Sequence, residues 1–242
     1  MKGKPTMRSH SVAPGKDGTD SAPRQIKQTT RFAVKEIFYT LQGEGLHTGR
    51  AAVFCRFSGC NLWNGREEAR KKAICQFCDT DFIGLDGENG GNYEAEELAS
   101  KVASVWEAGC HSRVGQPYLV CTGGEPLLQL DEELLEEFHN KGLEVAVETN
   151  GTLPIPSAVD WVTVSPKANT KLAVTSGDEL KLVFPQIDNV PADFESLDFR
   201  HFFLQPMDGP GGDENTSLAS NFCMSNPRWR LSLQTHKLLG LQ

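Results

Sequence analysis

The sequence lacks the features that carry proteins into membranes or onto polyanions. No apolar run approaches the roughly 20 residues that a membrane-spanning helix needs, and the first residues have no apolar core like that of a signal peptide. Basic residues number 24 against 32 acidic ones, so the formal net charge is −8. Such a charge disfavours binding to nucleic acid or to an anionic membrane surface. We therefore expect a cytoplasmic protein with no nucleic-acid partner and no membrane partner.

The sequence also lacks the cysteine pattern of a disulfide-stapled protein, and it has no internal repeat. Seven cysteines, an odd number, fit thiols that are kept reduced. At 242 residues, with 38% hydrophobic residues, the chain is long enough to bury one sizeable core. Residues 1–30 contain few apolar side chains, so we expect a disordered N-terminal tail or an added leader there. A single domain is predicted over residues 31–242.

Three of the cysteines form a C-x14-C-x2-C pattern at Cys60, Cys75 and Cys78. The short gap lets two thiolates converge on one centre, and a loop must bring in Cys60. No fourth cysteine is near. Structural zinc requires four closed ligands, whereas a four-iron cluster held by three thiolates leaves one iron open. Two other interpretations stay open: thiols that merely share a loop, and a zinc-binding interaction module with His47 or Cys55 as fourth ligand.

Strands and helices alternate along much of the chain. Helices are predicted at 93–107, 131–141 and 215–224, with a short solvated helix in the 61–74 segment. Asn92 is the expected cap of the first of these. Strands are predicted at 32–39, 52–57, 118–122, 144–148, 161–164, 180–184, 202–204 and 228–233. This order predicts an α/β fold with a mostly parallel sheet and few helices, forming a partial, incomplete barrel.

Glycines, prolines and polar residues follow the predicted strands, where the carboxyl ends of parallel strands place functional groups. Taken alone, each of these segments also fits an ordinary turn, and Arg56 fits an arginine that reaches solvent. Their coincidence at strand ends favours a site. The segments are Leu41-Gln42-Gly43-Glu44, Cys60, Gly123-Gly124-Glu125, Glu148-Thr149-Asn150, Ser165-Pro166-Lys167 and Gln205-Pro206-Met207-Asp208.

These residues resemble the radical S-adenosylmethionine superfamily, with Phe77 as the aromatic residue before the last cluster ligand and a Gly-Gly-Glu-Pro motif at 123–126. More narrowly, the segments at 38–45, 78–80, 148–151, 165–167 and 234–237 resemble the 7-carboxy-7-deazaguanine synthase family. One feature departs from the superfamily, whose usual spacing is C-x3-C-x2-C. A 14-residue excursion that returns near Cys60 preserves the cluster, because ligation depends on where the sulfurs lie in space.

The resemblance implies three cofactors in a radical S-adenosylmethionine catalytic domain. It implies a [4Fe-4S] cluster on Cys60, Cys75 and Cys78, and a magnesium ion on Thr80, although Asp79-Thr80 also fits a helix cap. The residues implied to bind S-adenosylmethionine are Phe77, Cys78, Asp79, Gly124, Glu125, Ser165, Pro166, Lys167, Gln205, Pro206, Met207 and Asp208.

The resemblance also implies the reaction, a lyase step in queuosine or 7-deazapurine biosynthesis. The substrate would be 6-carboxy-5,6,7,8-tetrahydropterin, and the products 7-carboxy-7-deazaguanine and ammonia. Implied partners are an electron donor such as flavodoxin or ferredoxin, and a second copy in a homodimer. The residues expected to contact the substrate are Leu41, Gln42, Gly43, Glu44, Arg56, Thr122 and Gln242. The implied catalytic residues are the three cluster cysteines and Thr122, which is expected where the substrate meets the radical. The competing enzymatic interpretation is a glycyl-radical-enzyme activase.

Overall fold

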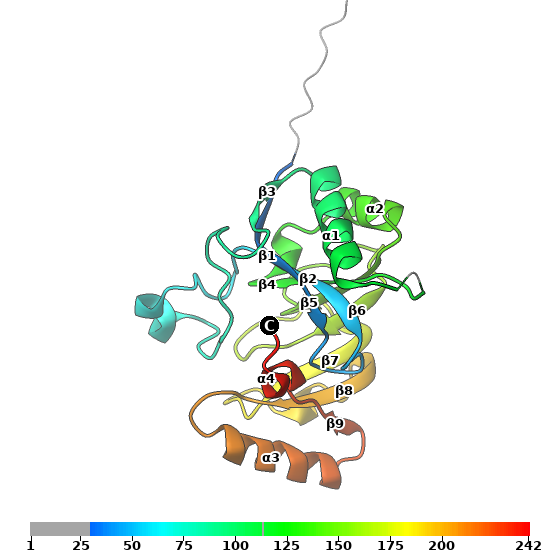
Figure 1. The fold of residues 1–242 in the computed structure, drawn as a ribbon. Coiled ribbons are helices and arrows are strands. Elements are labelled where there is room, and N and C mark those ends of the chain that lie inside the picture. Colours follow the sequence, from blue (N-terminus) through cyan, green and yellow to red (C-terminus); the bar gives the residue numbers. More distant parts are fainter. Residues whose placement is uncertain (1–29, 113) are drawn as a thin grey trace, which may run out of the picture.

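The computed structural model describes residues 30–112 and 114–242, so the expected tail lies almost wholly outside the described residues. Nine strands form one sheet in the order β3-β1-β2-β4-β5-β6-β7-β8-β9 (Figure 1). The strands are β1 (Phe32–Leu41), β2 (Ala51–Phe57), β3 (Gly91–Tyr93), β4 (Tyr118–Gly123), β5 (Glu144–Thr149), β6 (Trp161–Val164), β7 (Ser176–Phe184), β8 (Asp198–Pro206) and β9 (Trp229–Leu231).

The sheet is parallel from β2 through β9, and only β1 runs antiparallel to its two neighbours. The reason lies in the connection after β1, where a short turn is closed by hydrogen bonds between Gln42 and both Arg50 (2.8 Å) and Gly49 (2.8 Å). Short turns join antiparallel strands, whereas parallel neighbours need longer crossovers. The sheet does not close, which confirms the predicted α/β class and the partial barrel.

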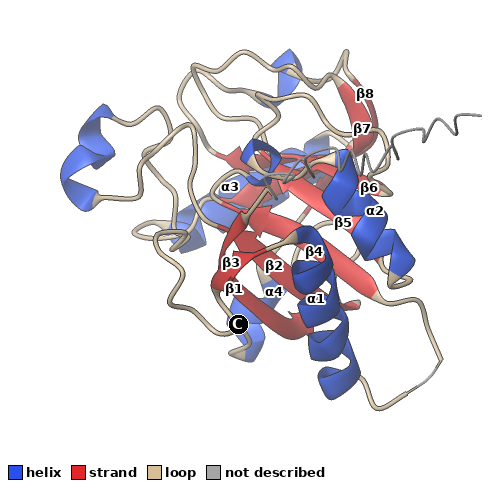
Figure 2. Ribbon diagram, turned by 90° about the horizontal axis from the view of Figure 1, so that it is seen from above, coloured by secondary structure: helices blue, strands red, loops and turns tan. Residues whose placement is uncertain are grey.

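The longer helices pack on one side of the curved sheet (Figure 2). Helices α1 (Ala95–Gly109) and α2 (Glu132–Asn140) pack on β1, β2, β4 and β5 over a core that includes Leu98 and Leu134. Helix α3 (Gly212–Ser225) covers β8 and β9 over a second core around Trp229. No helix in the described part of the chain is long and apolar enough to cross a membrane.

Several predicted boundaries shift. Strand β3 was not predicted, and α1 begins after it, capped by Glu94 in a capping box with Glu97 rather than by Asn92. The 61–74 excursion contains the 3-10 helix η1 (Glu67–Lys72), which has no buried residues and projects from the body of the protein (Figure 1). Two further 3-10 helices, η2 (Pro126–Leu128) and η3 (Pro191–Asp193), were also not predicted.

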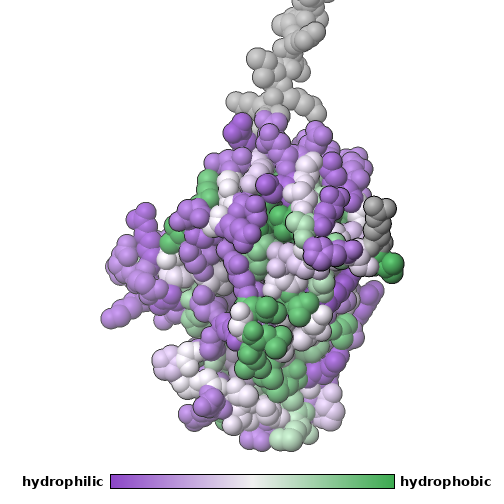
Figure 3. Space-filling view, viewed as in Figure 1, coloured by the Kyte–Doolittle hydropathy of each residue, from purple (hydrophilic) through white to green (hydrophobic). Residues whose placement is uncertain are grey.

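The chain ends on a helix that the sequence patterns did not predict, α4 (Thr235–Leu239). It lies over the open side of the sheet, beneath the chain end in Figure 1. Leu238 and Leu239 of α4 are 75% and 63% exposed, and Leu241 is also exposed. Figure 3 shows an apolar patch in this region.

Candidate active site

A cavity of about 410 Å³ opens at the carboxyl ends of the strands. The predicted site residues that line it are Leu41, Gln42, Gly43, Glu44, Arg56, Asp79, Thr80, Thr122, Ser165, Gln205 and Gln242. A smaller cavity of about 100 Å³ lies beside it. The predicted residues that line this one are Cys75, Phe77, Cys78, Asp79, Lys167, Gln205, Pro206, Met207 and Asp208. Asp79 and Gln205 border both spaces, so molecules bound in the two cavities would be neighbours.

Cys60, Gly124, Glu125 and Pro166 line neither cavity. The structure nevertheless brings Cys60 close to the other two cysteines. The pKa values of Cys60 and Cys75 are raised, mainly by burial and also by the neighbouring thiols, Cys78 acting on both. Three thiols gathered at one loop, with no fourth among them, fit a cluster that keeps one iron open.

The described residues contain no group of three or more His, Cys, Asp or Glu side chains arranged for a single metal ion. The two residues considered as a fourth zinc ligand lie elsewhere. Cys55 is fully buried in the core beneath α1 and α2. His47 packs against Tyr118 and Trp161, with ring centroids 5.4 and 4.3 Å away. The zinc hypothesis therefore has no support in the geometry.

The excursion between the first two cysteines is held in place by Arg70, to which sequence reasoning gave no role. Its guanidinium stacks on Trp63 at 4.0 Å and donates to the carbonyl oxygens of Gln76 (3.0 Å) and Cys78 (2.9 Å). These bonds fix the backbone around the last cysteine. Thus a 14-residue insertion returns to Cys60 through a defined loop.

Gly123 and Gly124 are required by the close approach of another chain segment. A Cβ on Gly123 would stand 2.2 Å from the Phe57 carbonyl oxygen, and its φ of +141° also favours glycine. The amide of Gly124 donates to that same oxygen (3.3 Å), and the amide of Glu125 donates to Gly59 (2.9 Å). The glycine pair therefore clamps the strand end that precedes Cys60.

Glu125 is fully buried and ties β4 to β5. Its carboxylate accepts hydrogen bonds from the Thr149 hydroxyl (2.7 Å), the Asn150 amide (2.8 Å) and the Leu127 amide (3.0 Å). Burial raises the pKa of Glu125, and these three donors oppose the shift. Glu125 is thus a structural support for the strand ends.

Lys167 folds back on its own turn rather than reaching outward. Its ammonium donates to the Ser165 carbonyl oxygen (2.9 Å) and hydroxyl (2.6 Å). It lies 5.8 Å from the centre of the Phe77 ring. Burial lowers the pKa of Lys167, and the nearby Cys75 opposes that shift. Lys167 therefore places positive charge beside the cysteine loop.

Arg56 is oriented by Glu36, a cavity residue that sequence reasoning missed. The Nε of Arg56 donates to the Glu36 carboxylate at 2.7 Å. The chain end meets the same carboxylate, because the Gln242 side chain donates to it at 2.9 Å. The backbone oxygen of Gln242 accepts from the Thr40 hydroxyl at 3.0 Å. The last residue is thereby held at the cavity wall.

The C-terminal segment closes over the two cavities. The amide of Thr235 donates to the Gly43 carbonyl oxygen (3.0 Å), and His236 leaves no room for a Cβ on Gly43. Lys237 bridges Asp79 (2.7 Å) and Asp208 (2.6 Å), which both border the smaller cavity. These contacts join the cysteine loop, the end of β8 and the chain terminus.

Lys181 is another cavity residue that sequence reasoning missed. It lies in the middle of β7, and its ammonium contacts the carboxylates of Glu44 and Glu148. A lysine inside an apolar strand is a sequence signal that could have indicated a functional role. The sequence could not indicate its partners, because Glu44 lies 137 residues away in the chain.

No protein-family model matches the chain. A 7-carboxy-7-deazaguanine synthase of Caulobacter vibrioides is 59% identical over 87% of this chain and 99% of the relative. Proteins of the same name from Burkholderia multivorans and Bacteroides thetaiotaomicron are 56% and 42% identical, over 87% and 86% of this chain and 99% and 98% of the relatives.

A solved structure agrees with these relatives. The crystal structure of QueE from Escherichia coli matches with a TM-score of 0.60 and 27% identity, covering 84% of this chain and 93% of that one. High identity over nearly the full length of the relatives, together with the same fold, establishes the relationship. The chain belongs to the 7-carboxy-7-deazaguanine synthase family of radical S-adenosylmethionine enzymes.

Proposed function

We propose that the chain converts 6-carboxy-5,6,7,8-tetrahydropterin to 7-carboxy-7-deazaguanine with release of ammonia. The observation that carries this proposal is the 59% sequence identity to a 7-carboxy-7-deazaguanine synthase, over 99% of the length of that relative. The cavity supports it, because acidic, basic and amide side chains line a space open at the strand ends. Such a site suits a small polar heterocycle that carries a carboxylate.

We assign the cofactor roles to the three cysteines, two of which line the smaller cavity, and to other residues around that cavity. Cys60, Cys75 and Cys78 would hold a [4Fe-4S] cluster, and Phe77 with Met207 would border S-adenosylmethionine. When bound, these groups supply the 5′-deoxyadenosyl radical. Lys167, buried beside the thiols, offsets part of the negative charge that three thiolates bring. An electron donor such as flavodoxin or ferredoxin would deliver the reducing electron.

We assign substrate contacts to the walls of the larger cavity. Arg56 would pair with the substrate carboxylate. Its Nε is held by Glu36, so its two terminal nitrogens would be the donors to that carboxylate. Thr80 would offer a hydroxyl to magnesium, which accepts oxygen ligands and keeps several waters. The carboxylate of Gln242, held by Thr40, would face the substrate. Leu41, Gln42 and Gly43 would border the ring through their backbone, and Thr122 would contact it beside Glu148.

The proposal is tested by anaerobic turnover. Reconstituted protein should contain about four iron and four sulfide ions per chain. With the tetrahydropterin, S-adenosylmethionine, magnesium and a reductant, it should form a product lighter by one ammonia. Unchanged tetrahydropterin would contradict the proposal. Formation of a glycyl radical in a partner protein would instead support the activase interpretation, and zinc without iron would support a zinc-binding module.

We also propose that the chain forms a homodimer. The proposed dimer surface is an exposed apolar patch next to the site, formed by Leu238, Leu239 and Leu241. Sedimentation should give twice the chain mass, and Leu238→Ser with Leu239→Ser should shift it toward the monomer. A monomeric wild-type protein at micromolar concentration would contradict the pairing.

A further inference from the structure

Lys181 stands between two carboxylates at the base of the larger cavity. Its side chain is only 6% exposed. The ammonium lies 2.5 Å from Glu44, which comes from the turn after β1, and 3.2 Å from Glu148 on β5. All three residues line the cavity. One buried cation therefore joins two acidic groups that come from distant parts of the chain.

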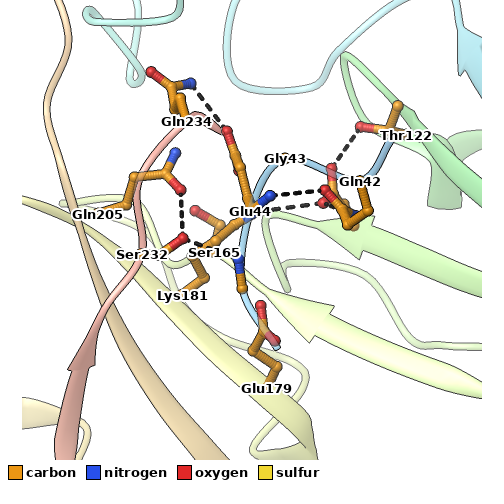
Figure 4. Close-up of polar contacts among 12 residues, drawn as sticks. Gln42, Gly43, Glu44, Thr122, Ser165, Glu179, Lys181, Gln205, Ser232 and Gln234 are labelled. Carbon is orange, nitrogen blue, oxygen red and sulfur yellow. Dashed lines mark hydrogen bonds and ion pairs between the residues drawn. The ribbon is translucent and has the colours of Figure 1, made fainter. Parts of the chain in front are cut away.

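Other donors fix both carboxylates. Gln234 donates to Glu44 at 2.9 Å, as Figure 4 shows. Gln42 and Thr122 donate to the two oxygens of Glu148, at 3.3 and 3.2 Å. A carboxylate oxygen has two lone pairs. Oε1 of Glu148 uses both on Gln42 and Lys181, whereas Oε2 of Glu148 and both oxygens of Glu44 accept one donor each and keep one lone pair. The two ionised carboxylates therefore present hydrogen-bond acceptors to the cavity and no hydrogen-bond donors.

The charges of this network depend on Lys181. Burial alone would raise the pKa of Glu44, but Lys181, helped by Gln234 and His236, lowers it to about 2. Burial opposes the charge on Lys181, yet its pKa is raised because Glu148, Glu44 and Glu179 surround it. Lys167 is a further cation near the group. Without Lys181, the partly buried carboxylates of Glu44 and Glu148 would lose their shared counter-charge, and Glu44, whose pKa Lys181 lowers, would take up a proton more readily.

We propose that Lys181 is a positioning residue that determines which heterocycle the cavity accepts. By keeping Glu44 and Glu148 as pure acceptors, it selects a ring edge that carries adjacent N–H donors and rejects one that carries a carbonyl oxygen there. A 2-amino-4-oxo pyrimidine ring presents its N3–H and 2-amino group in this way, whereas a 2,4-dioxo ring presents an oxygen at position 2. The inference rests on the proposed function and refines its substrate class.

The test compares two fluorescent, air-stable probes, 6-carboxypterin and 6-carboxylumazine, in equilibrium titrations of the complete protein. Wild-type protein should bind the pterin at least about 100-fold more tightly, since sites built around a hydrogen-bonded N–H strongly reject analogues without it. In Lys181→Met, a protonated carboxyl can donate to the lumazine oxygen, so the preference should fall below about tenfold. Pterin binding by this variant should strengthen as the pH rises, because the proton leaves.

Two further variants separate selectivity from folding. Lys181→Arg keeps the charge and should restore much of the preference for the pterin. Lys141→Met, at the end of α2 and far from the cavity, should bind both probes as the wild type does. If Lys181→Met does not fold, Glu148→Gln supplies the same comparison, because its amide can donate to the lumazine oxygen.

The outcomes distinguish this inference from the proposed function. A wild-type preference kept in Lys181→Met, or in Glu148→Gln where that variant stands in, overturns the inference even if turnover occurs. Wild-type protein that binds neither probe, or both equally, overturns it too. Failure of wild-type turnover together with a strong, Lys181-dependent preference would overturn the proposed reaction and leave the recognition role in place.

Discussion

A Cβ on Gly124 would stand 2.1 Å from the carbonyl oxygen of Gly59, so any larger residue at position 124 would collide with the Gly59 backbone. The obstacle is backbone, which cannot rotate away like a side chain. We predict that Gly124→Ala displaces the loop that carries Cys60 and lowers iron binding to less than half of the wild-type value. The measurement is iron per chain after anaerobic reconstitution.

Gly212 provides the matched control for this substitution. It is the first residue of α3, and a Cβ there would meet nothing within 4 Å. Gly212→Ala should leave iron binding unchanged and should not reduce stability. Equal iron contents in the two variants would show that the contact between Gly124 and Gly59 does not position the cysteine loop.

Removal of the Glu125 carboxylate should weaken the contact between the ends of β4 and β5. Glu125→Ala removes the acceptor of three donors: two are buried, at Thr149 and Asn150, and the Leu127 amide is partly buried. We expect the free energy of unfolding to fall by about 3 kcal/mol, since each orphaned buried donor costs about 1–3 kcal/mol and the effects are not additive. Denaturant unfolding measures it. A loss under about 1 kcal/mol would mean that water or a shifted side chain replaces the carboxylate.

Glu44 should make stability depend on pH in the acid range. Its pKa falls from 4.5 to about 2 on folding. A carboxyl with a lowered pKa stabilises the fold above its unfolded value, and this contribution, about 3 kcal/mol, is lost as the pH falls from 4.5 toward 2. Unfolding of Glu44→Gln between pH 6 and 3 should show a shallower acid slope than the wild type. Identical acid slopes for the two proteins would show that the ion pair of Glu44 does not contribute to the pH dependence of stability.

Lys237 should matter for cosubstrate binding more than for stability. It is 40% exposed, and its partners Asp79 and Asp208 are about half exposed, so the pairs contribute only about 0–1 kcal/mol to folding. Lys237→Met frees two aspartates that border the smaller cavity. We expect a few-fold higher KM for S-adenosylmethionine and a nearly unchanged melting temperature. A large drop in melting temperature with an unchanged KM would reverse this assignment.

The fold was predictable where the sequence carries its own signals. Helix α2 lies between Asp131, which caps it, and Gly142, whose φ of +76° ends it, so its bounds follow from local chemistry. Strand β3 has only three residues and exists because β1 pairs with it. Helix α4 has only five residues, and its position depends on a hydrogen bond to Gly43 at the far end of the chain. Such elements form through tertiary contacts that no local pattern encodes.

The residues of the candidate site also fall into those that the sequence predicted and those that it did not. Motifs at strand ends predicted most residues that line the two cavities, because parallel strands bring their ends together. The residues that orient them were missed. Arg70 sits in a polar excursion and Glu36 in an ordinary strand, and each acquires its role only from a contact partner. The roles of the predicted residues in binding remain predictions.

The most direct test of the account is product formation by matched cysteine variants under strict anaerobic conditions. Wild-type protein and Cys223→Ala, altered on α3 away from the cysteine loop, should convert the tetrahydropterin to a product lighter by one ammonia, identified as 7-carboxy-7-deazaguanine by mass spectrometry. Cys75→Ala should bind little iron and should form no 7-carboxy-7-deazaguanine. Product formation by Cys75→Ala at the wild-type rate would contradict the account.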